Sequence, residues 1–400
     1  MRSWPARTPA GPEVMKSGPL LSPTGGLRIG ILGGGQLGRM LGLAGIPLGF
    51  RFLFLDPAPD ACAAVTGDLL EAGFDDREAA LELGRQVDVA TFDFENVPES
   101  SARALSELCP LYPGSNALGA SQDRLVEKDL LVSLGARVPL YHEVSSRTDL
   151  LDGLERLGYP AVLKTRRFGY DGKGQAVLRD AEDLERAWQK LGDSPLILEA
   201  FVPFEAECSL IGVRARDGDT RFWPLTGNVH LDGILALSKP GGFEAGLQAA
   251  AERIMTGLMD HLDYTGVLTI EFFLHDGELL FNEFAPRVHN SGHWTIDGAE
   301  TSQFENHLRA ISGLPLGATG LAAPSLMFNW IGQMPPLSGA MEIPGLHWHD
   351  YGKQPRPGRK IGHATLTAPS DEALWERAER LARIAGGKFP ALLGKLFSEA

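Results

Sequence analysis

The sequence predicts an α/β protein of two or three domains, and three observations support this class. The chain has 400 residues, and an ordinary domain has roughly 150. Its content of 44% hydrophobic and 22% charged residues is typical of a globular protein. Near the N-terminus, short apolar runs at 27–32, 50–55 and 87–92 alternate with helical segments. This alternation indicates a parallel sheet covered by helices.

Composition also excludes several classes of function. No apolar run approaches the roughly 18 residues of a membrane span, so we expect no membrane partner. The net charge is 37 − 51 = −14, with Lys and Arg scattered, which argues against nucleic acid. Cys62, Cys109 and Cys208 form no CxxC pair, which favours a reducing cytoplasm over disulfides or a zinc site. Residues 1–26, rich in Pro, Gly and Ser, are predicted to be a disordered tail.

A glycine-rich turn follows the first predicted strand. Gly33, Gly35 and Gly38 match G-x-G-x-x-G, and Asp56 stands 56 − 38 = 18 residues further on, at the end of the next predicted strand. This spacing is that of a dinucleotide fingerprint. The same glycines also suit another phosphate-bearing ligand, or close packing alone. The motif therefore leaves three interpretations open: a nicotinamide or flavin cofactor, a different phosphate ligand, or packing.

From about Asp123 the pattern changes, because strand candidates now follow one another through a loop or a hairpin turn, and we predict an α+β architecture for this part. The predicted elements are a helix at 124–134, a strand ending at Lys164, a helix at 181–191, a strand ending at Glu199, a strand-rich region at 205–223, a hairpin at 266–284 and a helix at 371–385. A second glycine loop, 169–174, connects strand to strand and lacks the Lys-Ser/Thr pair of a P-loop. Such a loop can fold its N–H groups over a triphosphate, with Lys164 and Lys173 offsetting the charge. The alternative is an exposed turn.

Two carboxylates lie on the arms of the predicted hairpin. Glu271 and Glu283, with Asn282 alongside, suit Mg²⁺, which prefers oxygen ligands shared with substrate phosphates. A two-residue turn at 276–277 would set Asn282 opposite Glu271, because side chains alternate along a strand. We therefore expect an odd-length loop centred on Gly277. The alternative is two solvated glutamates on separate faces.

Polar residues after the hairpin indicate anion binding. Arg287, His289 and Asn290 could hold a small oxyanion, since a guanidinium grips a carboxylate at two points; taken alone, such histidines are more often structural. A basic set near the C-terminus could bind a phosphate monoester, although a solvated basic turn would have the same composition. Its members are Lys353, Arg356, Arg359 and Lys360.

Taken together, these segments resemble the ATP-grasp N5-carboxyaminoimidazole ribonucleotide synthetases of purine biosynthesis, over about 27–385. The shared segments are 31–40, 92–98, 169–175, 227–230, 281–290 and 356–360. The resemblance implies an ATP-grasp fold with an N-terminal Rossmann-like domain, a mobile lid subdomain and a small C-terminal domain. The expected boundaries are 27–122 for the N-terminal domain, 123–202 for the lid, 203–320 for the large subdomain with the metal site, and 321–400 for the C-terminal domain.

The resemblance also implies a reaction. ATP phosphorylates bicarbonate to carboxyphosphate, and the carboxyl group passes to the exocyclic amine of 5-aminoimidazole ribonucleotide. The implied cofactor is Mg²⁺, with Mn²⁺ as a substitute, and no nicotinamide, flavin or biotin. The implied partners are ATP, bicarbonate and the ribonucleotide, with a homodimer as the assembly and the cytoplasm as the location.

The same resemblance implies roles for individual residues. ATP contacts are Arg124, Lys164, Gly169, Tyr170, Asp171, Gly172, Lys173, Gly174, Gln175, Glu199, Ala200, Phe201, Val202, Glu207, His230, Asn282 and Glu283. Ribonucleotide contacts are Gly35, Gln36, Glu95, Tyr170, Asp171, Lys173, Lys353 and Arg359 or Lys360. Glu271 and Glu283 hold the metal, and the catalytic residues are Arg287, His289, Asn290 and Asp171, with Asp171 hypothesised to take the amine proton.

Two departures and three rival functions complete the prediction. Phe168 stands where a further glycine is common in the family, and Leu231 where a basic residue is common.

The first rival function is that of an ATP-grasp ligase that activates formate, which would share most of the site. A nicotinamide oxidoreductase would use the first glycine turn but leave the second loop and the glutamates unexplained. A nucleotide sensor would not require the whole set of charged residues.

Overall fold

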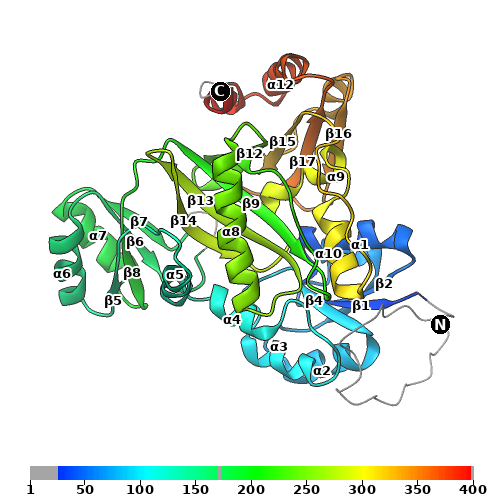
Figure 1. Cartoon of the computed structure of the whole chain (residues 1–400), viewed down its shortest axis with the longest axis horizontal. Coiled ribbons are helices and arrows are strands. Elements are labelled where there is room, and N and C mark those ends of the chain that lie inside the picture. Colours follow the sequence, from blue (N-terminus) through cyan, green and yellow to red (C-terminus); the bar gives the residue numbers. More distant parts are fainter. Residues whose placement is uncertain (1–25, 170–172, 398–400) are drawn as a thin grey trace.

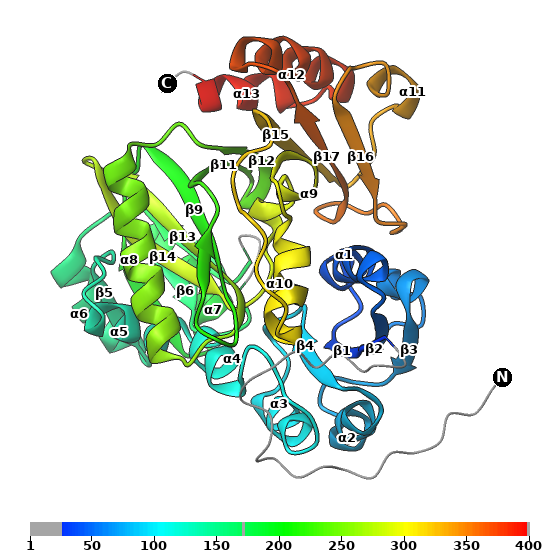
Figure 2. The ribbon, with the colours of Figure 1, turned by 45° about the vertical axis from the view of Figure 1, so that its right-hand side comes forward.

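The computed structural model describes residues 26–169 and 173–397, and these residues form three β-sheets (Figure 1). The predicted tail at 1–26 lies almost wholly outside the described residues, as do Tyr170, Asp171 and Gly172. Figures 1 and 2 show the first sheet and the C-terminal strands on one side of the molecule and the second sheet on the other. Among the described residues, no helix combines the length and the apolar character needed to cross a lipid bilayer.

The first sheet is parallel, which confirms the α/β prediction for the N-terminal part. Its order is β3-β2-β1-β4, with β1 at Arg28–Leu32, β2 at Arg51–Asp56, β3 at Asp68–Glu71 and β4 at Val89–Phe92. Its helical elements are α1 (Gln36–Gly45), η1 (Ile46–Leu48), η2 (Cys62–Thr66), α2 (Arg77–Gln86), α3 (Glu99–Ser106) and α4 (Ser115–Ser121). The central strands β1 and β2 are largely buried because helices cover both faces of a parallel sheet.

The second sheet is a small antiparallel one with the order β5-β8-β6-β7. Its strands are β5 (Tyr141–Val144), β6 (Ala161–Thr165), β7 (Gln175–Leu178) and β8 (Leu196–Ala200), covered by α6 (Arg147–Leu157) and α7 (Ala181–Leu191). The glycine loop joins β6 to β7, which pair with Lys164 opposite Gln175. Helix α5 (Arg124–Ser133) leads into this part and begins at Asp123, whose carboxylate caps it.

The third sheet has nine described strands and follows the order β14-β13-β9-β11-β12-β15-β17-β16, with β10 beside β9. Its strands are β9 (Ala206–Arg214), β10 (Thr220–Phe222), β11 (Thr226–Leu231), β12 (Ile234–Pro240), β13 (Gly266–His275), β14 (Glu278–Ala285), β15 (Ser325–Ile331), β16 (Leu346–Asp350) and β17 (Lys360–Thr367). Its helices are α8 (Ala245–His261), η3 (Asn290–Gly292), α9 (Thr295–Gly298), α10 (Gln303–Ser312), α11 (Leu337–Ala340), α12 (Asp371–Ala385) and α13 (Phe389–Phe397). Strands β12 and β15 pair directly, so the expected boundary at 320/321 divides one continuous sheet.

The β13–β14 hairpin corrects one prediction and confirms its consequence. The odd-length loop is wrong: His275 pairs with Glu278, which leaves the two-residue turn Asp276-Gly277. Both turn residues have positive φ, 51° and 72°, as a type I′ turn requires. The register changes by one residue at a bulge between the pairs Phe272–Phe281 and Glu271–Glu283, where Asn282 of β14 has no partner on β13. Glu271 therefore lies opposite Glu283, as expected, but for a different reason.

One buried histidine ties the first sheet to the third. The Nδ1 atom of His307, on α10, accepts the Val267 N–H of β13 at 3.0 Å. Its Nε2 atom must then carry the proton, and it donates to the Thr91 hydroxyl of β4 at 2.8 Å. The side chain is buried, and burial lowers the pKa of His307 to about 3.

This histidine predicts acid lability. Because its folded pKa lies below the unfolded value near 6.5, the stabilisation is complete above pH 6.5 and is lost as the pH falls toward 3. Between pH 7 and pH 5 the loss is about 2 kcal/mol. We expect His307→Gln to lower stability at pH 7, and its deficit relative to the native protein to shrink by about that amount at pH 5. Urea unfolding at both pH values measures this; an equal deficit at both would contradict it, and exposed His261→Gln is the control.

Candidate active site

A cavity of about 690 Å³ opens where the three sheets meet, and most of the predicted site residues line it. They are Gly35, Gln36, Glu95, Arg124, Lys164, Gly169, Lys173, Gln175, Phe201, Glu207, His230, Glu271, Asn282, Glu283, Arg287, His289, Asn290 and Lys360. The predicted residues that are described but are not part of this lining are Gly174, Glu199, Ala200, Val202, Lys353 and Arg359. Residues more than 300 positions apart in the sequence thus surround one space large enough for a nucleotide.

Two buried lysines share one buried glutamate beside the cavity. Glu199 lies 2.8 Å from Lys164 Nζ and 3.4 Å from Lys128 Nζ. Burial alone would raise the pKa of Glu199, but the two ammonium groups outweigh burial and lower it to about 2. The side chain of Glu199 therefore orients Lys164, a contribution that the prediction of backbone contacts to ATP at 199–202 did not include.

The paired carboxylates of the hairpin face the cavity together. Glu271 Oε1 lies 3.1 Å from His289 Nε2, and Glu283 Oε2 lies 2.7 Å from Arg124 Nη1. Burial would raise the pKa of Glu271, but His289 lowers it to about 2. Beside them, the buried Oδ1 atom of Asn282 has no hydrogen-bond partner among the described residues. Two carboxylates and an unused amide oxygen form an all-oxygen donor set, which fits Mg²⁺.

Arg287, His289 and Asn290 lie together at the cavity wall, as predicted. Arg287 Nε donates to Glu95, and the guanidinium holds the pKa of that carboxyl below its usual range, although burial acts in the opposite direction. Both polar atoms of the buried Asn290 amide have no hydrogen-bond partner among the described residues. A buried amide of this kind needs a partner, and a small oxyanion or its hydroxyl group would provide one.

The first glycine turn binds the chain's own carboxylates. Asp93 Oδ2 accepts the N–H groups of Gly35 at 3.0 Å and Gly38 at 2.8 Å, and Asp56 Oδ2 accepts that of Gly34 at 2.7 Å. Burial raises the pKa of Asp93 to about 6, although these N–H groups oppose the shift. The N–H groups that a cofactor pyrophosphate would need are thus already bonded, which argues against the nicotinamide interpretation.

The predicted basic set divides between two places. Lys360 begins β17 and lines the cavity. Lys353 Nζ donates to the Gln36 side chain at the start of α1, and Arg359 donates to the Gln354 carbonyl at 3.2 Å. The Lys353–Gln36 contact joins the C-terminal part to the glycine turn. Gln36 itself lines the cavity, so Lys353 reaches the site through it.

Sequence reasoning did not select several residues that line the cavity or support it. Asp93 and Glu127 line it, and the buried Lys128 stands behind it. Burial, followed by the Glu283 carboxylate, raises the pKa of Glu127 to about 8. Glu127 and Lys128 follow Arg124 at helical spacing, i+3 and i+4, and this spacing places them on the same face of the helix. Charged residues on a helix face usually indicate solvent, so only the structure reveals that this face is buried.

Aromatic side chains are also part of the cavity lining. Phe204 stacks on Phe273 with ring centroids 4.9 Å apart, and Phe74 lies 5.6 Å from Phe94. Phe168 is 71% exposed and has a φ of 62°, a backbone conformation that favours glycine. A glycine would be unstrained in this conformation, whereas Phe168 adopts it with its side chain in the cavity lining.

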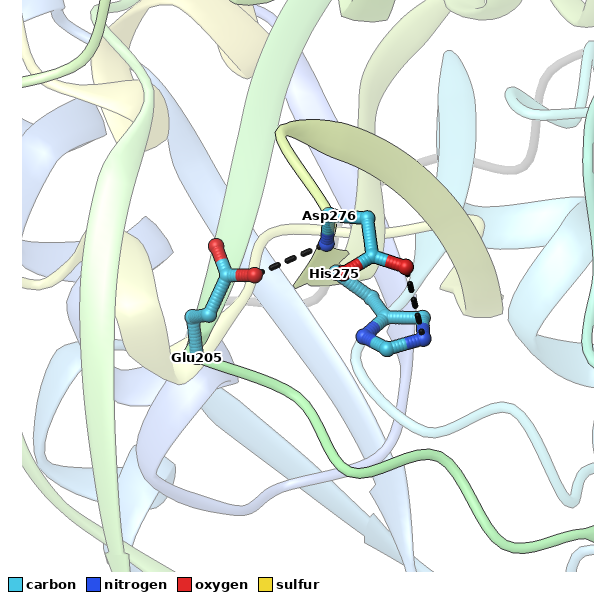
Figure 3. Close-up of side chains that lie close together, drawn as sticks. All are labelled: Glu205, His275 and Asp276. Atoms are coloured by element: carbon cyan, nitrogen blue, oxygen red, sulfur yellow. Dashed lines mark hydrogen bonds and ion pairs between the residues drawn. The ribbon is translucent and has the colours of Figure 1, made fainter.

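A separate cluster at the hairpin tip lies outside the cavity lining (Figure 3). Glu205 Oε1 accepts the Asp276 N–H at 2.8 Å, and His275 Nε2 lies 3.5 Å from Asp276 Oδ2. Glu205 and Asp276 are exposed, and the hydrogen bond fixes the two-residue turn. The cluster therefore closes the hairpin and takes no part in the site.

Three family models match the chain in order. They are the ribonucleotide synthetase preATP-grasp domain at 27–122, the ATP-grasp domain at 129–304 and the phosphoribosylaminoimidazole carboxylase C-terminal domain at 325–377. These matches, with the sheet arrangement described above, give the chain the ATP-grasp fold.

Several similar proteins are named N5-carboxyaminoimidazole ribonucleotide synthase or synthetase. The N5-carboxyaminoimidazole ribonucleotide synthase of Pseudomonas aeruginosa is 52% identical, over 90% of this chain and 98% of the relative. The crystal structure of the synthetase from Thermus thermophilus has a TM-score of 0.86 at 52% identity, covering 90% of this chain and 99% of that one. The structure from Aspergillus clavatus, in complex with ADP and 5-aminoimidazole ribonucleotide, has a TM-score of 0.83 at 30% identity, covering 90% and 98%.

The glycine turn predicts a sharp sensitivity at Gly33. Its φ is 114°, and a Cβ there would lie 1.6 Å from Asp93 Oδ1. We expect Gly33→Ala to destabilise the fold by about 2–5 kcal/mol, from backbone strain and overpacking together. The control is Gly257→Ala in α8, where a Cβ meets open space and stability should rise by roughly 1 kcal/mol. Urea unfolding compares them, and a native midpoint for Gly33→Ala would refute the role of the turn.

Proposed function

The chain belongs to the N5-carboxyaminoimidazole ribonucleotide synthase family, and we propose that it carboxylates 5-aminoimidazole ribonucleotide with ATP and bicarbonate. The products are N5-carboxyaminoimidazole ribonucleotide, ADP and phosphate, a step of purine biosynthesis. The observation that carries the proposal is the single cavity in which Lys164, the Glu271–Glu283 pair, Arg287 and Asn290 converge. The named complex of the Aspergillus relative with ADP and the ribonucleotide supports the same substrates.

The arrangement suits the activation of bicarbonate, which is a poor electrophile. Phosphorylation by ATP converts it to carboxyphosphate, whose phosphate is then a leaving group. Arg287 balances the charge of the anion, and the amide of Asn290 is free to bond its oxygens. His289 orients Glu271 and thereby joins the oxyanion site to the carboxylate pair. The contribution of these residues is positioning and charge neutralisation.

At the nucleotide end, Lys164 would contact the phosphates while Glu199 holds its ammonium group. Glu207 would contact the ribose, with its partner His230, which lies 2.8 Å away and whose pKa is raised by Glu207 against the effect of burial. The loop 169–175 would cover the phosphates. Its residues Tyr170, Asp171 and Gly172 lie outside the described residues, so the role of Asp171 as proton acceptor stays a prediction.

We assign the metal to Glu271 and Glu283, with Asn282 alongside. When bound there, Mg²⁺ supplies positive charge to the phosphate oxygens during phosphoryl transfer. Arg124 holds one oxygen of Glu283, and His289 holds one of Glu271. These two contacts orient the carboxylates before any ligand arrives, which lowers the reorganisation that binding requires.

The acceptor ribonucleotide would lie against the first domain. Gly35, Gln36 and Glu95 line that wall, Lys360 is part of the same cavity lining, and Lys353 reaches it through Gln36.

The family resemblance also supports three further proposals: domain boundaries at 27–122, 123–202, 203–320 and 321–400, a homodimer, and a cytoplasmic location. Light scattering on the purified protein would test the dimer.

The first test is ADP formation by the purified protein with Mg-ATP, omitting one substrate at a time. We expect ADP release to require the ribonucleotide, which accepts the carboxyl group. It should increase with bicarbonate, which accepts the phosphoryl group of ATP. Formate in place of bicarbonate should give no product, which separates this reaction from the rival ligase. Turnover independent of the ribonucleotide would reject the carboxylation.

The second test is Glu283→Gln. Removing this negative charge should lower kcat by a factor of ~10² or more, because a preorganised electrostatic group is lost, and should raise the Mg²⁺ concentration needed for half-maximal rate. The matched control is Glu278→Gln on the same strand, an exposed glutamate paired with Arg137, which should leave both unchanged. A normal Mg²⁺ dependence in Glu283→Gln would show that the metal assignment is wrong.

A further inference from the structure

Strand β14 lies at the edge of the third sheet, beside β13 alone. The outer side of an edge strand has backbone groups that no neighbouring strand bonds. Helix α5 covers this side and contacts β14, and Figure 1 shows it between β14 and the second sheet. The metal residue Glu283 lies in the covered stretch, so α5 is in a position to control its geometry.

Three residues on one face of α5 contact three consecutive residues of β14. Lys128 Nζ donates to the Asn282 carbonyl at 3.3 Å, and Glu127 Oε1 accepts the Phe284 N–H at 2.6 Å. Arg124 bonds the Glu283 carboxylate between them. The backbone N–H of Phe281 also donates away from the sheet, to the Arg137 carbonyl at 2.8 Å. The bulge and both its flanks are therefore bonded to α5 and the loop after it.

These contacts come from side chains that are expensive to bury. Lys128 is 0% exposed and Glu127 is 2% exposed. Removing the charges of the Lys128–Glu199 ion pair from water costs several kcal/mol each, and burying the polar carboxyl of Glu127 is also costly. Burial of these side chains is therefore weak evidence for a stabilising role. A role in fixing one strand geometry accounts better for their presence, because the bulge decides whether Glu283 faces Glu271.

Lys128 also links the metal strand to the nucleotide lysine. Its Nζ atom lies 3.4 Å from Glu199 Oε1, and the other oxygen of Glu199 lies 2.8 Å from Lys164 Nζ. Three successive hydrogen-bonded or ionic contacts, Asn282–Lys128, Lys128–Glu199 and Glu199–Lys164, thus connect the Asn282 carbonyl to Lys164. The buried Lys128 ammonium group therefore contacts both the strand that carries Glu283 and the glutamate that orients Lys164.

We propose that Glu127 and Lys128 are positioning residues that hold the β14 bulge, and thereby set Glu283 opposite Glu271 for metal binding. This inference rests on the metal assignment of the proposed function. Neither residue needs to touch metal or substrate: Glu127 acts as an oxygen acceptor for one backbone N–H, and Lys128 as a donor to one carbonyl.

The test is the affinity of the intact chain for Mn²⁺ in the presence of saturating ADP, read from the electron paramagnetic resonance signal of free Mn²⁺. Lys128→Met and Glu127→Ala should each weaken Mn²⁺ binding on the order of 10- to 100-fold, as expected when a residue that orients a metal ligand is removed. Glu127→Gln keeps an oxygen acceptor and should retain native affinity. Lys190→Met, an exposed lysine on α7, is the matched control. Binding of ADP without metal should be less affected than Mn²⁺ binding.

Each outcome decides the proposal. Native Mn²⁺ affinity in folded Lys128→Met or Glu127→Ala overturns it. Loss of Mn²⁺ binding in folded Glu127→Gln also overturns it, because the carboxylate charge would then be required rather than the acceptor oxygen. Circular dichroism reports folding. Should the other two variants not fold, Lys128→Gln replaces them: its shorter side chain cannot keep the contacts of the ammonium group, so weakened Mn²⁺ binding is expected and native affinity overturns the proposal. The Mn²⁺ measurement uses neither bicarbonate nor ribonucleotide. Its result can therefore be interpreted even if the carboxylation assay shows no activity.

Discussion

The geometry of the site depends on one extra residue in one strand. Asn282 forms the bulge of β14, and without it Glu283 would point to the opposite face from Glu271. The bulge is possible because β14 is an edge strand, whose outer backbone groups are free to bond elsewhere. Helix α5 meets those groups with Glu127 and Lys128, and the hairpin turn is fixed at its other end by Glu205. A two-residue turn and a one-residue bulge together have the same effect on register as the odd-length loop that was predicted from the alternation of side chains.

The site also shows how an acidic chain can bind anionic substrates. The net charge is −14, but the potential in a cavity is set by the nearest charges and by the low dielectric around them. Here Glu199, Glu271, Glu283 and Glu95 each have a cationic partner or an imidazole within ion-pair distance. Each pair orients a group before substrate arrives, so the arrangement is preorganised rather than assembled by binding.

Sequence reasoning predicted the parallel first sheet, the strand–loop–strand form of the second glycine loop, and helices α7 and α12 to the residue, because these rest on local periodicity and turn residues. Most of the described residues that it selected for the site also line the cavity. It missed Glu127, Lys128 and Asp93, because their burial arises from packing between distant elements, and a charged residue on a helix normally indicates solvent. The hairpin loop was predicted wrongly because a bulge leaves no mark in the spacing of side chains. The continuity of the third sheet past residue 320 is likewise a long-range pairing, with no local signal.

The glycine turn shows why a motif must be judged by what its backbone groups bond. A helix N-terminus with free N–H groups is an anion site, and here the anion is Asp93, supplied by the next strand of the same sheet. The absence of a Cβ at Gly33 is what lets this carboxylate approach. With those N–H groups bonded internally, the first turn of α1 is left to present the side chain of Gln36, which lines the cavity and bonds Lys353. A fingerprint that in other folds binds a cofactor therefore serves here to fix one wall of the cavity and to join it to the C-terminal part of the chain.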